Sequence, residues 1–462
     1  MGLRLLKLAA PLLFLAACNV APLPDGSPRD SDDTTAAARQ ALPPMKQFGA
    51  AQVRRPTRGN VALAQDFLEL SFEMESGRRL PRMTRFEGPV TVAVRGAPPA
   101  TLGQDLRALI ARLRSEAGID IRLARPNEPA SITVNVITQR ELRRLQPDAA
   151  CFILPNISTW EEFRRMRRSS LLDWSQLTER TQAAIFLPGD VAPQEIRDCL
   201  HEEIAQALGP LNDVYRLGDS IFNDDNFNRI LTGFDMLMLR AYYDGALRNG
   251  MTKGEVAARL PAILNRLNPG GRGRGGGNAS PTPRSWVDAV KRATGPGVGD
   301  SQRRNAAARA VAIARQAQWQ GPRAGFSLYI QGRLNLLRAP DLALASLLEA
   351  RAIYASSPDT ALHAASVATQ LAAFALSAGQ ADSAIKLVDD AIPTIKRAQN
   401  AGALATLLMI KAEALDLAGR PAEAAAVRLE SLGWGRYGFG DDATVRARLR
   451  EIRTLSPRPR GA

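Results

Sequence analysis

The stretch CLHEEIAQALGPLND, residues 199–213, decides how the surrounding domain folds. Its apolar side chains recur at the three- and four-residue spacing of a helix that buries one face. The adjacent carboxylates of Glu202 and Glu203 lie off that face, and Gly209 closes the pattern. Two interpretations follow: an ordinary amphipathic helix with solvated carboxylates, or a site built around them. The apolar positions are Leu200, Ile204, Ala207, Leu208 and Leu211.

The spacing of the polar residues in this helix resembles the zinc-binding pattern of the metzincin peptidases, HExxHxxGxxH/D. With Gly209 as the anchor, the three ligand positions hold Glu202, Gln206 and Asn212. The position of the water-activating glutamate holds Glu203. The resemblance implies an α+β domain with a metzincin-like mixed sheet and a helix of the active-site type, in which all three metal ligands have been replaced.

Two neighbouring stretches extend the resemblance. The candidate edge strand AAIFLPG, residues 183–189, precedes the helix, and SIFNDDN, residues 220–226, stands where metzincins have a turn that contains methionine. We therefore expect Ser220 and Phe222, together with Gly209, to shape a structural turn. The stretches EEIAQALG and SIFNDDN also resemble a bacterial envelope family labelled only as a domain of unknown function, and this second resemblance implies no known activity.

The histidine content limits the metal chemistry of such a site. The chain holds only His201 and His363, so a single chain cannot supply the three imidazoles of a three-histidine zinc site. Oxygen ligands suit Ca²⁺ or Mg²⁺ better, and Asp213, Asp224 and Asp225 add carboxylates if the following loop folds back. We therefore expect no cofactor, with a bound divalent cation as the alternative.

The first eighteen residues, MGLRLLKLAAPLLFLAAC, indicate export. A short basic start and an apolar run too short to span a bilayer are typical of a secretory signal peptide. The ending LAAC resembles the lipobox of bacterial lipoproteins, which implies removal of residues 1–17 and lipidation of Cys18. Because Asn19 follows, the resemblance implies a lipid-anchored envelope protein that faces the periplasm from the outer membrane of a Gram-negative bacterium.

Two cysteines remain once Cys18 is assigned to the anchor. The periplasm is oxidising, so Cys151 and Cys199 are expected to form a disulfide. This bond ties the helix that carries the two glutamates to the segment AACFILPNIS, residues 149–158.

Composition divides the rest of the chain into four parts. Residues 18–59 are rich in Pro, Asp, Ala and Thr without periodicity, which predicts a disordered tether. Residues 60–267 mix strand and helix patterns and form the α+β domain. Residues 268–285 are a linker rich in Gly, Pro and Arg. Residues 286–455 are expected to be all-helical.

The helical part contains an internal repeat of forty residues. Ala372, Gly379 and Ala384 recur as Ala412, Gly419 and Ala424, and a poorer copy precedes them. Small residues at helix contacts and a glycine in the turn resemble a tetratricopeptide repeat, in a longer variant. The resemblance implies stacked helix pairs with a surface for a protein or peptide partner; a plain helical bundle without a ligand is the alternative.

Charge bears on the choice of partner. Lysine and arginine number 60 against 46 acidic residues, a formal net charge of +14. Such a surface favours anionic partners, and export argues against nucleic acid among them. We favour a non-catalytic module that binds a peptide along a sheet edge while the helical repeats bind a partner. The alternatives are a divergent metallopeptidase with Glu203 as general base, and a structural protein that contacts anionic lipid or cell-wall polymer; the oligomeric state stays open.

Overall fold

The computed structural model describes residues 41–52, 54–276 and 280–457. The signal peptide expected for residues 1–17 and the lipidated Cys18 lie outside these described residues. None of the described helices is both long enough and apolar enough to cross a membrane.

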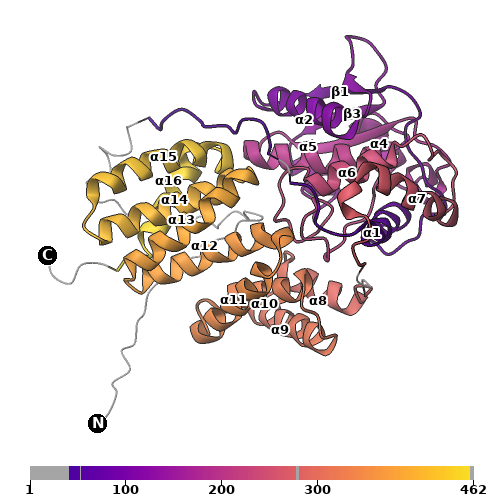
Figure 1. Cartoon of the computed structure of the whole chain (residues 1–462). Helices are drawn as coiled ribbons and strands as arrows, with labels where there is room; N and C mark the ends of the chain where they lie inside the picture. Colours follow the sequence, from indigo (N-terminus) through magenta and orange to yellow (C-terminus); the bar gives the residue numbers. More distant parts are fainter. Residues whose placement is uncertain (1–40, 53, 277–279, 458–462) are drawn as a thin grey trace.

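A five-stranded mixed sheet forms the centre of the first unit (Figure 1). Its order is β2-β1-β3-β5-β4; β4 alone runs antiparallel to its neighbour, and the other pairs are parallel. The strands are β1 (Val90–Gly96), β2 (Ile121–Leu123), β3 (Ile132–Ile137), β4 (Phe152–Pro155) and β5 (Ala183–Pro188). The stretch AAIFLPG was expected at the edge of the sheet, and this expectation is wrong. It forms β5, which is buried along its whole length between β3 and β4.

Helices cover both faces of the sheet, and the mixture of parallel and antiparallel strands agrees with the predicted α+β class. Strands with both faces covered often read as continuous apolar runs, and β5 does so. β3 is buried almost throughout, although Thr133 and Asn135 alternate with its apolar residues. One face packs against α2 and α5, while Phe152 and Phe186 on the other face pack against α4. The helices are α1 (Asn60–Phe72), α2 (Leu102–Ala117), α3 (Gln139–Leu145), α4 (Trp160–Met166), α5 (Pro193–Leu208), α6 (Gly233–Tyr242) and α7 (Lys253–Leu267). Short 3-10 turns are η2 (Ser170–Leu172), η3 (Trp174–Gln176) and η4 (Pro269–Gly271).

The predicted disulfide is confirmed. Cys151, just before β4, is bonded to Cys199 in α5, across 48 positions of sequence. The bond fixes the short edge strand to the helix that carries Glu202 and Glu203.

The second unit is all-helical, as predicted. Its elements pair as antiparallel neighbours joined by short turns, and Gly379 and Gly419 occupy equivalent turns with φ of 76° and 74°. This left-handed region favours glycine. The elements are α8 (Arg284–Thr294), α9 (Asp300–Gln316), α10 (Pro322–Asn335), α11 (Pro340–Ala355), η5 (Pro358–Thr360), α12 (Ala361–Ser377), α13 (Ala381–Arg397), α14 (Ala401–Leu417), α15 (Pro421–Phe439) and α16 (Asp442–Arg453).

Aromatic side chains join the two units. Tyr215 and Phe227, from the loop between α5 and α6, belong to the apolar core of the helical unit. The Tyr215 ring meets Trp286 of α8 edge-on, with centroids 5.0 Å apart. Phe227 stacks against His363 of α12 at 4.4 Å, and the imidazole in turn bonds Asp225 at 2.8 Å. The long α5–α6 loop is therefore held from both sides.

The described residues before α1 form a strap across the two units (Figure 1). Phe48 stacks on Trp434 of α15 with centroids 4.4 Å apart, and the Lys46 N–H donates to the Gly433 carbonyl. Farther along, Arg58 pairs with Asp66 and Asp219 of the α+β unit. This part of the tether expected for residues 18–59 is thus packed, because its aromatic and charged side chains find partners on both units.

Candidate carboxylate site beside helix α5

Helix α5 begins and ends where its sequence requires. Pro193 occupies the first turn, where a missing N–H costs no hydrogen bond. Gly209 ends the helix directly against α6: a Cβ there would stand 2.8 Å from the ring of Tyr242. The predicted turn residue is therefore explained by a close approach of two elements.

A buried arginine that the sequence analysis missed holds the end of α5. The guanidinium of Arg180 donates to the carbonyl oxygens of Gln206 and Ala207 at 2.6 and 2.8 Å, and to that of Gly209 at 2.5 Å. These are the carbonyls that the last turn of a helix leaves without partners. Arg180 lies in the irregular segment between η3 and β5, where no periodic pattern marks it.

The predicted second turn is built on hydrogen bonds. The Ser220 hydroxyl donates to Asp235 of α6 at 2.6 Å, and the Phe222 N–H donates to the Ser220 oxygen at 3.0 Å. Phe222 is fully buried in the core beneath α5. Ser220 and Phe222 therefore shape the loop that carries the next group of carboxylates.

Three carboxylates from separate segments meet at this loop. Carboxylate oxygens of Glu75, Asp213 and Asp224 all lie within 4.8 Å of one another. Glu75 follows α1 and is exposed, whereas the other two are half-buried in the α5–α6 loop. Asp213 Oδ1 and Asp224 Oδ2 are shielded from solvent and have no hydrogen-bond partner.

Glu203 lies behind these residues in α5. Its side chain is 3% exposed, and Oε2 has no hydrogen-bond partner. Burial raises the pKa of Glu203 to about 8, and the charge of Asp213 adds to this rise. The carboxyl is therefore enclosed, and the interpretation of α5 as a helix with solvated glutamates is wrong for this residue.

The other carboxyl groups are perturbed in the same direction. Burial raises the pKa of Glu202, and the charges of Glu203 and Asp224 raise it further. Burial also raises the pKa of Asp213, with added repulsion from Asp224 and Glu202. Burial raises the pKa of Asp224 to about 6. Each of these groups therefore lies near at least one other carboxylate that disfavours its ionised form.

Few positive groups balance this charge. Lys291 of α8 forms an ion pair with Glu75, and its charge also favours the ionised form of Asp224. The Tyr215 hydroxyl lies against Asp224 and lowers the pKa of that carboxyl in part. The cluster thus lies where the α+β unit meets the first helix of the helical unit.

The proposed zinc-like ligand set is distributed differently from its sequence pattern. The Gln206 amide donates to Asp213 Oδ2 at 3.3 Å and so faces the cluster, and Glu202 lies close enough to raise the pKa of Asp213. Asn212 instead donates to the backbone carbonyl of Glu69 at 3.1 Å. Asn212 fastens the loop to α1. The next residue, Asp213, supplies the carboxylate that faces the cluster.

The two histidines and Asp225 serve the structure elsewhere. His201 is buried, and its Nδ1 accepts from the Leu231 N–H at 3.2 Å. Burial lowers the pKa of His201 well below its usual value. Asp225 is engaged by His363 and so does not join Asp213 and Asp224.

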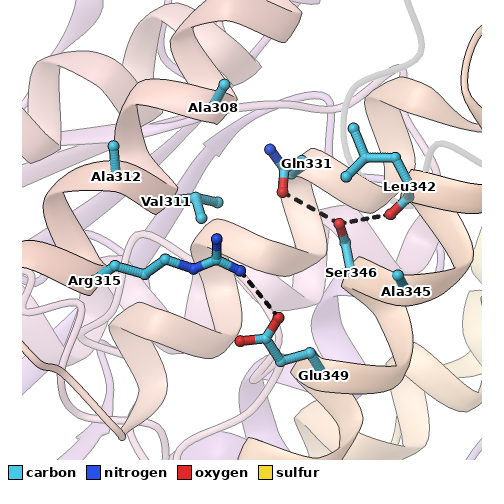
Figure 2. Close-up of a pocket in the computed structure, with 9 residues that line it drawn as sticks. All are labelled: Ala308, Val311, Ala312, Arg315, Gln331, Leu342, Ala345, Ser346 and Glu349. Carbon is cyan, nitrogen blue, oxygen red and sulfur yellow. Dashed lines mark hydrogen bonds and ion pairs between the residues drawn. The ribbon is translucent and has the colours of Figure 1, made fainter.

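A separate hollow lies in the helical unit, between α9, α10 and α11 (Figure 2). Its volume is about 340 Å³, and most of its lining is apolar. An ion pair between Arg315 and Glu349 stands at one side, and Ser346 bonds Gln331 within it. Leu342 and Leu348 on α11 are 45% and 51% exposed.

Comparison with known proteins places the first unit in a class. Residues 60–262 match the model of a family described as a protein of unknown function, DUF2927. The match runs from the first residue of α1 into α7 and includes the whole sheet. No curated protein and no solved structure matches the chain. The chain therefore contains a DUF2927 domain followed by a helical region.

Proposed function

We propose that this chain is a lipid-anchored envelope protein whose DUF2927 domain binds an extended peptide or protein segment along β4. The outer side of β4 carries the proposal, because the sheet order ends at this strand and no described strand pairs with it. Addition of a peptide strand to a free sheet edge is a common mode of recognition.

The hydrogen-bond pattern identifies the backbone groups that a peptide meets. The Asn156 N–H donates to the Gln182 carbonyl. The backbone N–H and C=O of every second residue, namely Leu154 and Phe152, therefore also face β5. Alternation along an antiparallel ladder therefore turns the N–H and C=O of Ile153, and the C=O of Pro155, away from the sheet. The outer side of β4 is short and ends in proline, a combination that discourages unwanted pairing between sheets.

The position of β4 supports a binding role. The disulfide fixes its start to α5, and Phe152 packs into the aromatic cluster with Trp160, Phe163 and Phe186. A strand held on both faces presents its backbone in a fixed geometry, which reduces the ordering cost of binding. An antiparallel edge strand beside the glutamate-bearing helix also supports the proposed likeness to metzincins.

Burial of Glu203 favours binding over hydrolysis. A general base has to reach the proton that it abstracts, whereas Glu203 is 3% exposed. A pKa of about 8 is nevertheless suitable for a base near neutral pH, and this one observation favours the divergent metallopeptidase as the second candidate. Incubation of the chain with a peptide library distinguishes the two: cleavage that Glu203→Gln abolishes would establish the peptidase.

A peptide array tests the binding proposal. We expect the purified chain to retain peptides on the array, and Ile153→Pro to weaken retention about ten-fold because the outward N–H is lost. Ile153→Val is the matched control, since it loses similar packing but keeps the N–H. Equal retention by wild type and both variants would exclude β4 as the binding edge.

The anchor is tested in cells. Cys18→Ala removes the proposed lipidation residue, and we expect the chain to move from the membrane fraction to the soluble periplasmic fraction. A variant that remains in the outer membrane would contradict lipid anchoring through Cys18.

We also propose that the helical region binds a protein partner through the hollow between α9 and α11. The apolar lining and the exposed Leu342 of α11 support this role. A photo-crosslinking amino acid in place of Ala345 should give one discrete adduct in cells, and Leu342→Glu should remove it. A diffuse set of adducts, insensitive to Leu342→Glu, would contradict a specific surface.

A further inference from the structure

The carboxylates beside α5 lie close together although they come from distant parts of the sequence. Glu75 lies three residues after the end of α1, while Asp213 and Asp224 stand eleven positions apart in the α5–α6 loop. Their oxygens nevertheless lie within 4.8 Å of one another. Like charges this close are unfavourable unless a positive group lies between them.

Unpaired buried oxygens are the second, independent observation. Only 3% of Glu203 is exposed, and its Oε2 has no hydrogen-bond partner. Asp213, whose charge acts on Glu203, has an unpaired oxygen of its own, as does Asp224. Buried polar oxygens without partners are costly, and a bound ion is one of the arrangements that satisfies them in native proteins.

The positive groups nearby are too few to neutralise these carboxylates. Lys291 is one ammonium, and its ion pair is with Glu75, the most exposed carboxylate of the group. Arg229 acts on Glu202 but is shared with Asp198. The cluster therefore keeps several negative groups for each positive one.

We propose that Glu75, Asp213 and Asp224, with Glu203 behind them, bind a divalent cation that prefers oxygen ligands, namely Ca²⁺. Oxygens on opposite sides of a Ca²⁺ ion are separated by about 4.6–5.2 Å, and Ca²⁺ tolerates irregular ligand geometry. The spacing of up to 4.8 Å fits this span. Mg²⁺ demands a tighter octahedral arrangement.

The site is distinct from the peptide edge and has a structural consequence. Its ligands connect the end of α1 to the α5–α6 loop, and Lys291 brings α8 of the helical unit to the same place. A bound cation takes over the role of the ammonium toward Glu75. Cation binding therefore fastens the loop whose aromatic residues join the two units.

Terbium luminescence measures the site directly. Tyr215 lies against Asp224, and Trp286 lies 5.0 Å from the Tyr215 ring, so both can sensitise a Tb³⁺ ion bound at Asp224. We expect the chelator-treated full chain to bind one Tb³⁺ with sensitised emission, and CaCl₂ to displace it. Calorimetric titration with CaCl₂ and with MgCl₂ then gives the preference, which we expect to favour Ca²⁺.

Four variants decide whether the named residues form the site. Asp213→Asn and Glu75→Gln should each weaken Ca²⁺ binding about ten-fold or more, because affinity follows the charge of the ligands. Lys291→Met should strengthen it, since the competing ammonium is gone. Glu73→Gln, on the same segment as Glu75 but paired with Lys253, is the control and should leave it unchanged.

Circular dichroism of every variant separates loss of binding from loss of folding, and Glu75, being exposed, can be changed without disturbing a core. Absence of a saturable Tb³⁺ or Ca²⁺ site in the wild-type chain would overturn the proposal. So would equal affinity in wild type, Asp213→Asn and Glu75→Gln. Peptide retention is measured in EDTA, so a failure of the Ca²⁺ proposal can be distinguished from a failure of the proposal that β4 binds a peptide.

Discussion

At the scale of single residues, Glu203 shows how the fold changes the chemistry of a side chain. It occupies the sequence position of a general base, yet its carboxyl is enclosed and partly unpaired. Enclosure favours the protonated form in the folded state, because desolvation penalises the charge. The same group in the unfolded chain ionises near its ordinary pKa of 4.5. The folded protein therefore holds more protons than the unfolded chain between these pKa values.

The sign of this difference gives a prediction in EDTA. Between about pH 4.5 and about pH 8 the folded state binds more protons, so the free energy of unfolding falls as pH rises. Glu203→Gln removes that contribution, and its stability should fall less over the same range. Thermal denaturation from about pH 5 to about pH 9 measures it, with exposed Glu161→Gln as the control. Parallel pH profiles for wild type and Glu203→Gln would contradict a buried, protonated Glu203.

The sequence revealed only part of the site at this scale. Spacing within α5 placed Glu202, Glu203 and Gln206 together, because a helix has a fixed period. Asn212 was assigned from the metzincin pattern, which expects a ligand after the turn at Gly209. In the structure Asn212 bonds the Glu69 carbonyl after that turn, and Asp213 faces the cluster instead. Glu75 lies in a separate segment after α1, and only tertiary folding brings it near.

At the scale of elements, the edge strand and α5 depend on one covalent bond. β4 is four residues long, and so short a strand has few ladder bonds of its own. The Cys151–Cys199 bond supplies the missing restraint and closes a loop across 48 positions. Oxidising conditions therefore help to hold β4 in place.

Removal of this bond gives the second prediction. Cys151→Ser with Cys199→Ser should lower the free energy of unfolding by about 2–4 kcal/mol, the usual effect of a disulfide that closes a loop of this length. It should also speed hydrogen exchange in β4, because the restraint on the strand is lost. Chemical denaturation measures the first effect, with the oxidised wild type and the reduced wild type as references. A double variant as stable as the oxidised protein would show that the bond does not restrain the fold.

Helices and turns were predicted best where the sequence pattern repeats over a long stretch. The forty-residue spacing placed Gly379 and Gly419 in equivalent turns, and the structure confirms both. The edge strand was assigned to residues 183–189 from the resemblance to metzincins, in which an edge strand precedes the helix. The actual edge, FILP, is too short to give a periodic signal, and strand order depends on tertiary pairing.

At the scale of the whole molecule, the α5–α6 loop connects the carboxylate cluster to the helical unit. Phe227 inserts among Phe326, Tyr329, Tyr354 and His363. Asp225, two residues before it, bonds the buried His363. Asp224, one residue earlier, belongs to the carboxylate cluster. Adjacent residues of one loop thus serve the interface and the site.

This arrangement predicts that the two units unfold together. Phe227→Ala removes a buried ring, which costs about 3–5 kcal/mol, and most of that cost falls on the interface. Scanning calorimetry should show one transition for the wild type and two for Phe227→Ala. Leu429→Ala changes an exposed side chain of α15 and is the control. Two transitions in the wild type would show that the units are not coupled.

Hydrogen–deuterium exchange of the segment 151–156, with and without the most strongly retained array peptide, tests the peptide edge most directly. We predict that exchange in this segment slows when the peptide is bound, because the outward N–H of Ile153 gains a hydrogen bond. Unchanged exchange in this segment, with slowing confined to α9–α11, would contradict the proposed role of β4.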